Sequence, residues 1–484
     1  MASKSFKKNL GRGKRLGGIH VLYPNPPTLR KSPAPGYDSK DMIRLLDLRG
    51  LNITLSTVKG FVPRSAVNES GTHAVVEKLM EDVRREGVKA LIDQAREFDQ
   101  VEDLDPIVGK KELTQAAAGL DGDLKAAIQE SIRRVRAVSE DSLPGPSTTE
   151  FHTGGSVTTR YVPVTRAGVY VPGGKAVYPS SVIMNVVAAQ AAGVAEIVLV
   201  SPPQSDYDGR IHPTILATAE LLGVTEIYAL GGAGAIAALA WGVPGIGLEP
   251  VAMITGPGNR YVAAAKRAVK GVVGIDSEAG PSEIGIIADD TAHPEFIAAD
   301  LISQAEHDEF ASAVLMTNSM ELAERVTLAL ERRVPEMRHR ERIEAALRGE
   351  QSALVVCDSL EHVVLLSNAT APEHLEVMVD RPAEILDDLV HAGAIFVGDY
   401  TPVSAGDYSA GSNHVLPTHG TAAFSSGLSP MTFLRTQQII EYGKDALSHI
   451  APHVETFAHA EDLPAHAEAI AERFVERLDS GSGE

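Results

Sequence analysis

The chain has 484 residues, of which 44% are hydrophobic and 22% are charged, a composition typical of a globular protein with about two to four domains. Its formal charge of −20 argues against a general affinity for nucleic acid or anionic membranes. The single cysteine, Cys357, excludes an intrachain disulfide and a multi-cysteine metal site. No apolar run has the length of a membrane span, so we expect a soluble cytoplasmic protein.

The first 41 residues are basic, rich in Gly, Ser and Pro, and without the apolar core of a secretory signal. This composition indicates a disordered extension, with a targeting or binding tail as the alternative. Folded sequence is predicted to begin at Met42, in MIRLLDLRG. Helical spacing of apolar residues then predicts a helix over 72–98, interrupted near Gly87, and helices in KKELTQAAAGL and GDLKAAIQESIRRVRAVSE. LPGPS ends this helical layer.

From residue 155 strands alternate with helices. The predicted strands are GSVTTRYVPV, AGVYVP, EIVLVSPP, EIYALGG and VAMITGPGN, and the predicted helices are SVIMNVVAAQAAG, HPTILATAELLG and GAIAALAWG. Such alternation predicts βαβ units and a parallel sheet that binds ligands beyond the carboxyl ends of its strands.

A second alternation starts near residue 284, with strands IGIIAD, SAVLMT, SALVVCD and GAIFVG and helices PEFIAADLISQAEH and MELAERVTLALERRV. Cys357 lies in one of these strands, which favours a buried packing role for its thiol. From about residue 430 the chain is predicted to return to helix, in MTFLRTQQIIEY and LPAHAEAIAERFVERL. The predicted fold class is α/β, with two similar Rossmann-like parallel-sheet domains and additional helical N- and C-terminal segments.

Three glycine-containing segments could approach a ligand. GVYVPGGKAVYP could present backbone N–H groups to a phosphate or form a tight turn. In LGGAGAIAAL, Gly232, Gly234 and Ala237 fit the dinucleotide pattern G-x-G-x-x-A only weakly, because no acidic residue follows at the ribose-binding distance. TGPGNRY places Asn259 at a predicted helix start, where its amide could contact a ligand or cap the helix.

A metal site is suggested by ISQAEHDEF, where Gln304 and His307 are three residues apart and would share one helical face. Asp407 and His414 in VSAGDYSAGSNHVLP and His466 in AEDLPAHAEA could supply further ligands. Spacing alone does not select these residues from the sixteen histidines of the chain.

Acid–base chemistry is suggested by APEHLEV, where Glu373 precedes His374 directly after a proline.

Together these segments resemble the histidinol dehydrogenase family, from about Met42 to Arg477. The strings that carry the resemblance are YVPGG, SSVIMNVVAAQAAG, GGAGAIAALAWG, ITGPGNRYV, EAGPSE, DLISQAEHD, PEHLE, SAGDYSAGSNHVLP and AEDLPAH, in matching order and spacing.

The resemblance implies an enzyme that uses NAD and one zinc ion per subunit to oxidise L-histidinol through L-histidinaldehyde to L-histidine, the last step of histidine biosynthesis. The implied zinc ligands are Gln304, His307, Asp407 and His466. The implied substrate contacts are Ser282, His374, Glu461 and the metal ligands. The implied catalytic pair is Glu373 and His374, and the implied NAD contacts are Tyr170, Gly234 and Asn259.

The resemblance also implies a homodimer of intertwined subunits, in which His466 reaches the partner's site. The expected division is a basic tail (1–41), a dimerisation segment (42–68), a first α/β domain with the zinc and catalytic residues (69–169 and 282–428), a second α/β domain on the NAD side (170–281) and a C-terminal helical segment (429–484).

One position departs from the family pattern, because Gly234 stands where the family usually has a glutamine that touches the cofactor. Losing one polar contact costs about 1 kcal/mol unless water replaces it, so we expect weaker NAD binding rather than loss of activity.

Aldehyde oxidation needs an added nucleophile, and the predicted burial of Cys357 favours water, activated by Glu373. Two alternatives to histidinol oxidation stay open: a paralogue that oxidises another small polar alcohol, and a zinc hydrolase.

Overall fold

The computed structural model describes residues 42–54, 71–173, 177–278 and 280–475. Residues Met42–Glu484 form one compact unit. The predicted tail, residues 55–68 of the predicted dimerisation segment, and residues 174–176 of the first glycine segment lie outside the described residues. None of the helices in the described ranges combines the length and apolar character that a membrane span requires.

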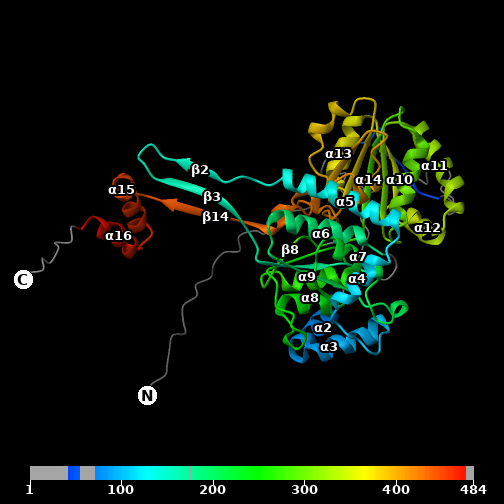
Figure 1. The fold of residues 1–484 in the computed structure, drawn as a ribbon. Helices are drawn as coiled ribbons and strands as arrows, with labels where there is room; N and C mark the ends of the chain where they lie inside the picture. Colours follow the sequence, from blue (N-terminus) through cyan, green and yellow to red (C-terminus); the bar gives the residue numbers. More distant parts are fainter. Residues whose placement is uncertain (1–41, 55–70, 174–176, 279, 476–484) are drawn as a thin grey trace, which may run out of the picture. The chain divides into compact units, whose positions relative to one another are not determined.

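Two parallel sheets confirm the predicted α/β class (Figure 1). The first has five strands in the order β6-β5-β4-β7-β8. Its strands are β4 (Arg166–Tyr170), β5 (Glu196–Ser201), β6 (Glu226–Ala229), β7 (Met253–Thr255) and β8 (Gly274–Ile275), and its helices are α6 (Pro179–Ala192), α7 (Pro213–Leu221), α8 (Gly232–Trp241) and α9 (Arg260–Val269). The strand order reverses direction at β4, so its carboxyl end is the switch point where such sheets bind ligands.

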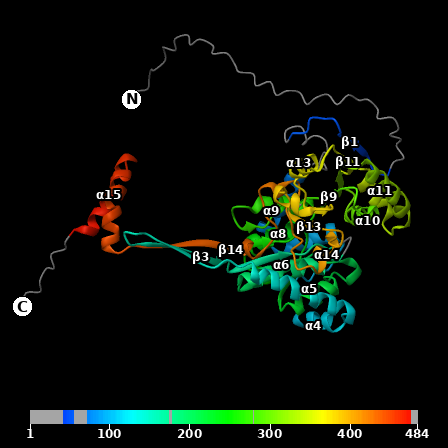
Figure 2. The ribbon, with the colours of Figure 1, turned by 90° about the horizontal axis from the view of Figure 1, so that it is seen from above.

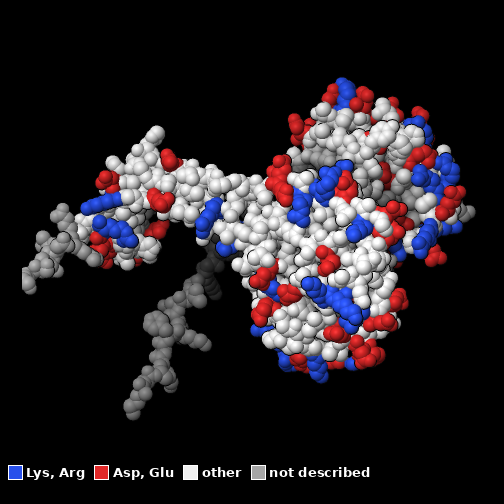
Figure 3. All heavy atoms as spheres, in the orientation of Figure 1, with Lys and Arg blue, Asp and Glu red and all other residues white. Residues whose placement is uncertain are grey.

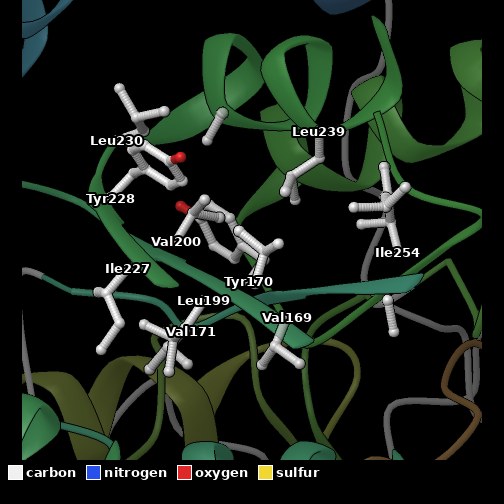
Figure 4. Close-up of a cluster of buried hydrophobic side chains, with 14 of the residues drawn as sticks. Val169, Tyr170, Val171, Leu199, Val200, Ile227, Tyr228, Leu230, Leu239 and Ile254 are labelled. Atoms are coloured by element: carbon white, nitrogen blue, oxygen red, sulfur yellow. The ribbon is translucent and has the colours of Figure 1, made fainter. Parts of the chain in front are cut away.

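The core of this sheet is a continuous hydrophobic cluster. Figure 4 shows Tyr170 within it, together with Val169, Val171 and Leu199. Helix α6 is buried on nearly all sides, which explains why its sequence has no charged residue.

The second parallel sheet has six strands in the order β1-β11-β10-β9-β12-β13. Its strands are β1 (Leu45–Asp47), β9 (Glu283–Ala288), β10 (Ser312–Thr317), β11 (Ala353–Val356), β12 (His374–Met378) and β13 (Ala394–Val397), and its helices are α10 (Pro294–Ala305), α11 (Met320–Arg333), α12 (Arg340–Arg348), α13 (Leu360–Thr370) and α14 (Val403–Tyr408). The predicted strands and helices of this region are thus confirmed.

Both faces of the six-stranded sheet are covered. Ile284 and Ile286 of β9 join a hydrophobic cluster with α10, α11 and α12, whereas Ile287 joins a second cluster with α13. Helices α10 and α11 are seen beside this sheet in Figure 2. Cys357 directly follows β11 and is fully buried, which confirms its predicted burial.

Four helices form the layer predicted for the N-terminal region. They are α2 (Thr72–Glu86), α3 (Val88–Gln94), α4 (Lys110–Ala118) and α5 (Gly122–Asp141). Gly87, with φ of +59°, separates α2 from α3, as the sequence predicts.

This layer packs on helices of the five-stranded sheet. Helix α2 lies against α8 and α9, α4 against α7, and α5 against α6, so the apolar faces of these helices belong to one hydrophobic cluster. The expected division grouped residues 69–169 with the other sheet, and β4 begins at Arg166, before the expected boundary at residue 170. These helices therefore pack on helices of the five-stranded sheet, and the division of the chain into domains stays a prediction.

A third, antiparallel sheet was not predicted. It contains β2 (Ser147–Glu150), β3 (Ser156–Pro163) and β14 (Leu434–Glu441) in the order β14-β3-β2. The predicted helix in MTFLRTQQIIEY is wrong, because a short 3₁₀ turn over Pro430–Phe433 leads into β14. Thr436, Ile439 and Ile440 suit a strand, and β14 pairs with β3 along its full length.

The C-terminal helices α15 (Lys444–Ala460) and α16 (Pro464–Ala471) follow β14 and pack on each other. Strand β14 is exposed along almost its entire length. Ile440 is 64% exposed and Phe457 is 70% exposed. The face in Figure 3 carries few charged side chains over β3 and β14. An exposed apolar surface of this kind marks an interaction site more often than a free surface.

Candidate functional site

The candidate catalytic residues lie at the amino edge of the six-stranded sheet. His374 is the first residue of β12 and Glu373 precedes it, while Ser282 precedes β9. Strands β9 and β12 are parallel neighbours, with His374 opposite Ile284. Parallel pairing in this register therefore brings Ser282, Glu373 and His374 together although they are far apart in sequence.

Glu373 is buried and held by two hydrogen bonds to one carboxylate oxygen. Ser282 Oγ donates to Glu373 Oε2 at 2.6 Å, and the backbone N–H of Glu283 donates to the same oxygen at 3.0 Å. Burial raises the pKa of Glu373 to about 7, and these hydrogen bonds limit the rise. A carboxyl group with this pKa can both release and accept a proton near neutral pH.

His374 is oriented by a backbone contact. Its Nδ1 lies 3.1 Å from the carbonyl oxygen of Glu283, so Nδ1 carries the proton and donates it. Nε2 is buried without a hydrogen-bond partner and lies 3.8 Å from Asp407 Oδ1. Burial lowers the pKa of His374, which favours the neutral imidazole that a general base requires.

Gln304 lies in the last turn of α10, and His307, three residues later, lies just after the end of the helix. Helix α10 ends at Ala305, and His307 follows in a turn whose N–H donates to the Gln304 carbonyl at 3.2 Å. Gln304 is only 2% exposed, and neither its Oε1 nor its Nε2 has a hydrogen-bond partner. His307 is exposed, and its Nδ1 donates to the Ser303 carbonyl at 3.1 Å.

Asp407 lies near the end of α14, and the loop after it carries His414. His414 Nδ1 donates to the Asp407 carbonyl at 2.9 Å, and its Nε2 lies 3.5 Å from Ser181 Oγ of α6. Asn413 donates to the Met184 carbonyl at 2.9 Å, so two contacts tie this loop to the helix of the other parallel sheet. His414 is named in the metal hypothesis without a specific role, and its position beside Asp407 makes it a further residue of this site.

The two C-terminal candidates are on separate, exposed elements. Glu461 directly follows α15, and His466 lies in the first turn of α16. Across the described ranges, no group of three or more His, Cys, Asp or Glu side chains is arranged to hold a metal ion. The chain alone therefore brings together Glu373, His374, Ser282 and Asp407, but does not assemble the complete set implied by the resemblance.

The residues that are present nevertheless fit a divalent cation. Neither polar atom of the buried Gln304 amide has a partner, and an unpaired buried polar group is costly unless a ligand satisfies it. Gln304 and Asp407 also lie in the last turns of α10 and α14, where the partial negative charge of a helix C-terminus favours a cation. Amide, imidazole and carboxylate ligands suit zinc.

The candidate NAD residues Tyr170 and Asn259 lie beyond the carboxyl edge of the five-stranded sheet. Tyr170 ends β4, at the switch point of that sheet, and its hydroxyl accepts a hydrogen bond from the N–H of Gly232 at 3.3 Å. Burial raises the pKa of Tyr170, so it stays a neutral phenol. Asn259 caps α9 through Oδ1, which accepts from the N–H groups of Tyr261 and Val262.

Gly234 is buried in the first turn of α8 and faces α3. A Cβ atom at this position would lie 2.3 Å from Gln94 Oε1 and 3.2 Å from Leu91 Cδ2. Gln94 is held there because its Nε2 donates to the Leu79 carbonyl at 2.9 Å. Packing against Gln94 therefore explains why position 234 is glycine, and no signal in the sequence links these two residues.

Comparison with known proteins gives a consistent result. The histidinol dehydrogenase family model matches residues 62–474. Histidinol dehydrogenase from Leifsonia xyli subsp. xyli is 51% identical over 435 residues, which are 90% of this chain and 100% of that protein. The protein of the same name from Thermobifida fusca is 52% identical over 434 residues, or 90% of this chain and 98% of the relative. The crystal structure of histidinol dehydrogenase from Elizabethkingia anophelis has a TM-score of 0.85 and 34% identity, covering 90% of this chain and 99% of that one.

Two neighbouring carboxyl groups, the buried Glu376 and the partly buried Asp300, lie on β12 and α10. Glu376 of β12 is 1% exposed, accepts a hydrogen bond from the N–H of Val403 at 2.8 Å, and has the carboxyl group of Asp300 of α10 as a close neighbour. Burial raises the pKa of Glu376 to about 9, and the neighbouring Asp300 adds to this rise. Burial also raises the pKa of Asp300. The pair connects α10, β12 and α14, and no sequence pattern indicated it.

The raised pKa of Glu376 predicts a pH-dependent stability. Because the folded state holds the proton more tightly, this stabilisation is complete below the ordinary pKa of 4.5 and is lost as the pH rises through about 9. We expect Glu376→Gln to have a wild-type free energy of unfolding at about pH 5 and to become the more stable protein towards about pH 9, as measured by urea denaturation. Exposed Glu361→Gln is the control, and an equal gap at both pH values would contradict the prediction.

Proposed function

This chain belongs to the histidinol dehydrogenase family, and on that premise we propose that it oxidises L-histidinol to L-histidine through L-histidinaldehyde, as the last step of histidine biosynthesis. The observation that carries the proposal is the buried pair Glu373 and His374, whose pKa values are shifted in opposite directions. A carboxyl group near neutral pKa beside a neutral imidazole is suited to repeated proton transfer at one carbon atom.

NAD supplies the hydride acceptor for both oxidations when it is bound. His374 Nε2 takes the hydroxyl proton in the first step, since Nδ1 is committed to the Glu283 carbonyl. Glu373 then removes a proton from the water that adds to the aldehyde, while Ser282 and the Glu283 N–H fix its carboxylate. His374 acts as base again for the second oxidation. The two proton acceptors are therefore held by backbone and side-chain contacts that do not involve the substrate.

Water rather than a thiolate adds to the aldehyde in this proposal. Cys357 is fully buried, and burial raises the pKa of its thiol to about 12. The thiolate is the reactive form of cysteine, so this residue is unsuited to nucleophilic attack.

The proposed zinc ligands are Gln304, His307, Asp407 and the partner's His466, with one ion per subunit. Zinc, when bound, would fix the imidazole and amine of the substrate and align the reacting carbon. Gln304 and Asp407 come from α10 and α14, two elements that Asp300 and Glu376 connect. Ser282, Glu461 and His374 would complete the contacts to the substrate.

The same proposal includes a homodimer with intertwined subunits. Support comes from the exposed strand β14, the exposed apolar side chains on β14 and α15, and the position of Glu461 and His466 on helices that pack mainly on each other. Tyr170, Asn259 and, more weakly, Gly234 are the proposed NAD contacts. Because Gln94 occupies the space beside Gly234, weaker NAD binding remains the expectation at that position.

The proposed function predicts a stoichiometry. Each histidinol consumed should yield two NADH, and a chelator should abolish NADH formation until zinc is restored, because the substrate is no longer held against the base. The measurement is NADH absorbance together with substrate consumption. One NADH per substrate would indicate a simple alcohol dehydrogenase, such as a paralogue with another substrate, and hydrolysis without NADH would indicate a zinc hydrolase.

Glu373→Gln should impair the second half-reaction most. The amide keeps the shape of the side chain but cannot take a proton from water, so we expect NADH formation from histidinaldehyde to fall by about 10²–10⁴-fold. Stopped assays on histidinol and on histidinaldehyde measure the two steps separately. Glu384→Gln on the exposed 3₁₀ turn Pro382–Glu384 serves as the control. Unchanged rates in both half-reactions would refute the role of Glu373 in water activation.

His466→Ala should lower the zinc content of the purified protein, whereas exposed His453→Ala on α15 should not. Because His466 is proposed to act in the partner's site, mixed dimers give a sharper result. His466→Ala and Asp407→Ala should each be inactive alone, but their heterodimer should regain one intact site and measurable NADH formation. Full zinc content in His466→Ala, or no recovery in verified heterodimers, would remove His466 from the partner's site.

A further inference from the structure

The loop between β7 and α9 lies directly on the backbone of Tyr170. Gly256 begins this loop with φ of +115°, and a Cβ atom there would lie 1.9 Å from the Tyr170 carbonyl oxygen. Only glycine permits this approach. The loop then runs through Pro257 and Gly258 to Asn259, the cap of α9. Its conformation therefore sets where Asn259 lies relative to the switch point of the sheet.

A buried ion pair holds both hydrogen-bonding groups of Gly256. Lys266 of α9 is 1% exposed, forms an ion pair with Asp276, and donates from Nζ to the Gly256 carbonyl at 2.9 Å. Asp276 follows β8, and its Oδ2 accepts from the Gly256 N–H at 2.8 Å. The side chain of Asp276 is 3% exposed. The glycine peptide groups are thus fixed from two sides by one pair of charges.

Stability alone does not account for such a pair. Removing two charges from water is costly, and replacing a buried ion pair by apolar side chains of similar volume is often neutral or stabilising. Lys266 and Asp276 do not contact Tyr170 or Asn259 in any hydrogen bond that the described residues form. What the pair provides is a fixed orientation for a loop whose glycines would otherwise allow many conformations.

We propose that Lys266 and Asp276 are a positioning pair that holds the Gly256–Asn259 loop in the conformation that binds NAD. This inference rests on the proposed function, because it takes Tyr170 and Asn259 as the cofactor side of the site. Without the pair, the loop becomes ordered only when NAD binds. The loss of conformational entropy then makes the free energy of NAD binding less favourable. Loss of the pair should therefore weaken the binding of NAD but not of histidinol, because the histidinol side of the site is built on the other parallel sheet.

The test compares two double variants. Lys266→Met with Asp276→Val removes both buried charges together, which avoids leaving one of them unpaired. We expect this variant to stay folded and to keep its KM for histidinol, but to bind NAD about tenfold more weakly in calorimetric titration. The matched control is Arg267→Met with Glu278→Gln. It removes the adjacent, partly exposed ion pair at 2.7 Å between the same two segments and should leave NAD affinity unchanged.

A folded Lys266→Met/Asp276→Val protein with wild-type NAD affinity would overturn the proposal, as would an equal loss in the control variant. If the variant does not fold, hydrogen exchange on the unmutated, NAD-free protein decides. Protection of the Gly256 amide comparable to β7 supports a pre-fixed loop, and rapid exchange suppressed only by NAD overturns it. NAD binding is measured without histidinol, so a wild-type protein that binds NAD but does not oxidise histidinol would refute the proposed function and leave this inference standing.

Discussion

The parallel pairing of β9 with β12 is the constraint on which the candidate active site depends. The register places His374 opposite Ile284, so Ser282, Glu283, Glu373 and His374 meet at one edge of the sheet. Backbone groups of β9 then hold the two catalytic side chains in place, because the N–H of Glu283 binds Glu373 and its carbonyl binds His374. A one-residue slip of this register would move both catalytic side chains to the opposite faces of the sheet. The site is therefore as rigid as the sheet that carries it.

The two parallel sheets present opposite ends to their candidate ligands. The five-stranded sheet offers the carboxyl end of β4 and the N-termini of α8 and α9, where backbone N–H groups and the helix dipole favour an anionic cofactor. The six-stranded sheet offers the amino ends of β9 and β12 and the C-termini of α10 and α14, where the dipole favours a cation. The usual rule that ligands bind beyond the carboxyl ends of parallel strands thus holds only for the five-stranded sheet. The six-stranded sheet differs because its candidate ligand is a cation, which the C-termini of α10 and α14 favour.

Local patterns in the sequence were sufficient for the elements of both parallel sheets, since their strands are buried on both faces and their helices have clear starts and ends. They gave a wrong prediction for MTFLRTQQIIEY, where the spacing of apolar residues predicts a helix but pairing with β3 makes the segment a strand. The pairing partner lies about 280 residues earlier in the chain, and no local pattern contains that information. The same limit hid Gln94 beside Gly234 and Asp300 beside Glu376, because each pair joins distant segments.

For the candidate site too, the sequence indicated some features and not others. Residue type and neighbours in sequence indicated Glu373 and His374, and family resemblance supplied the implied set, but burial decides which chemistry is possible. The pKa of Glu373 near 7 comes from its enclosure between β9 and β12, and no sequence pattern states the depth of a side chain. The spacing from Gln304 indicated His307, which lies just after the end of α10, but spacing does not state how deeply either side chain is buried. A turn that leaves His307 exposed and Gln304 buried gives the two side chains different access to a ligand.

The unpaired amide of Gln304 connects these observations to the proposed homodimer. Leaving a buried donor and acceptor unsatisfied costs about 1–3 kcal/mol for each group, and a bound cation would remove this cost for the amide oxygen. Glu461 and His466, which would complete the ligand shell, lie on exposed helices beyond a strand whose apolar side chains face solvent. One subunit thus has an unsatisfied buried site and an uncovered apolar surface. A second subunit would complete the site and cover the apolar surface if its C-terminal helices lay over the site. Association would then bury β14 and α15 and supply the missing ligands in one step.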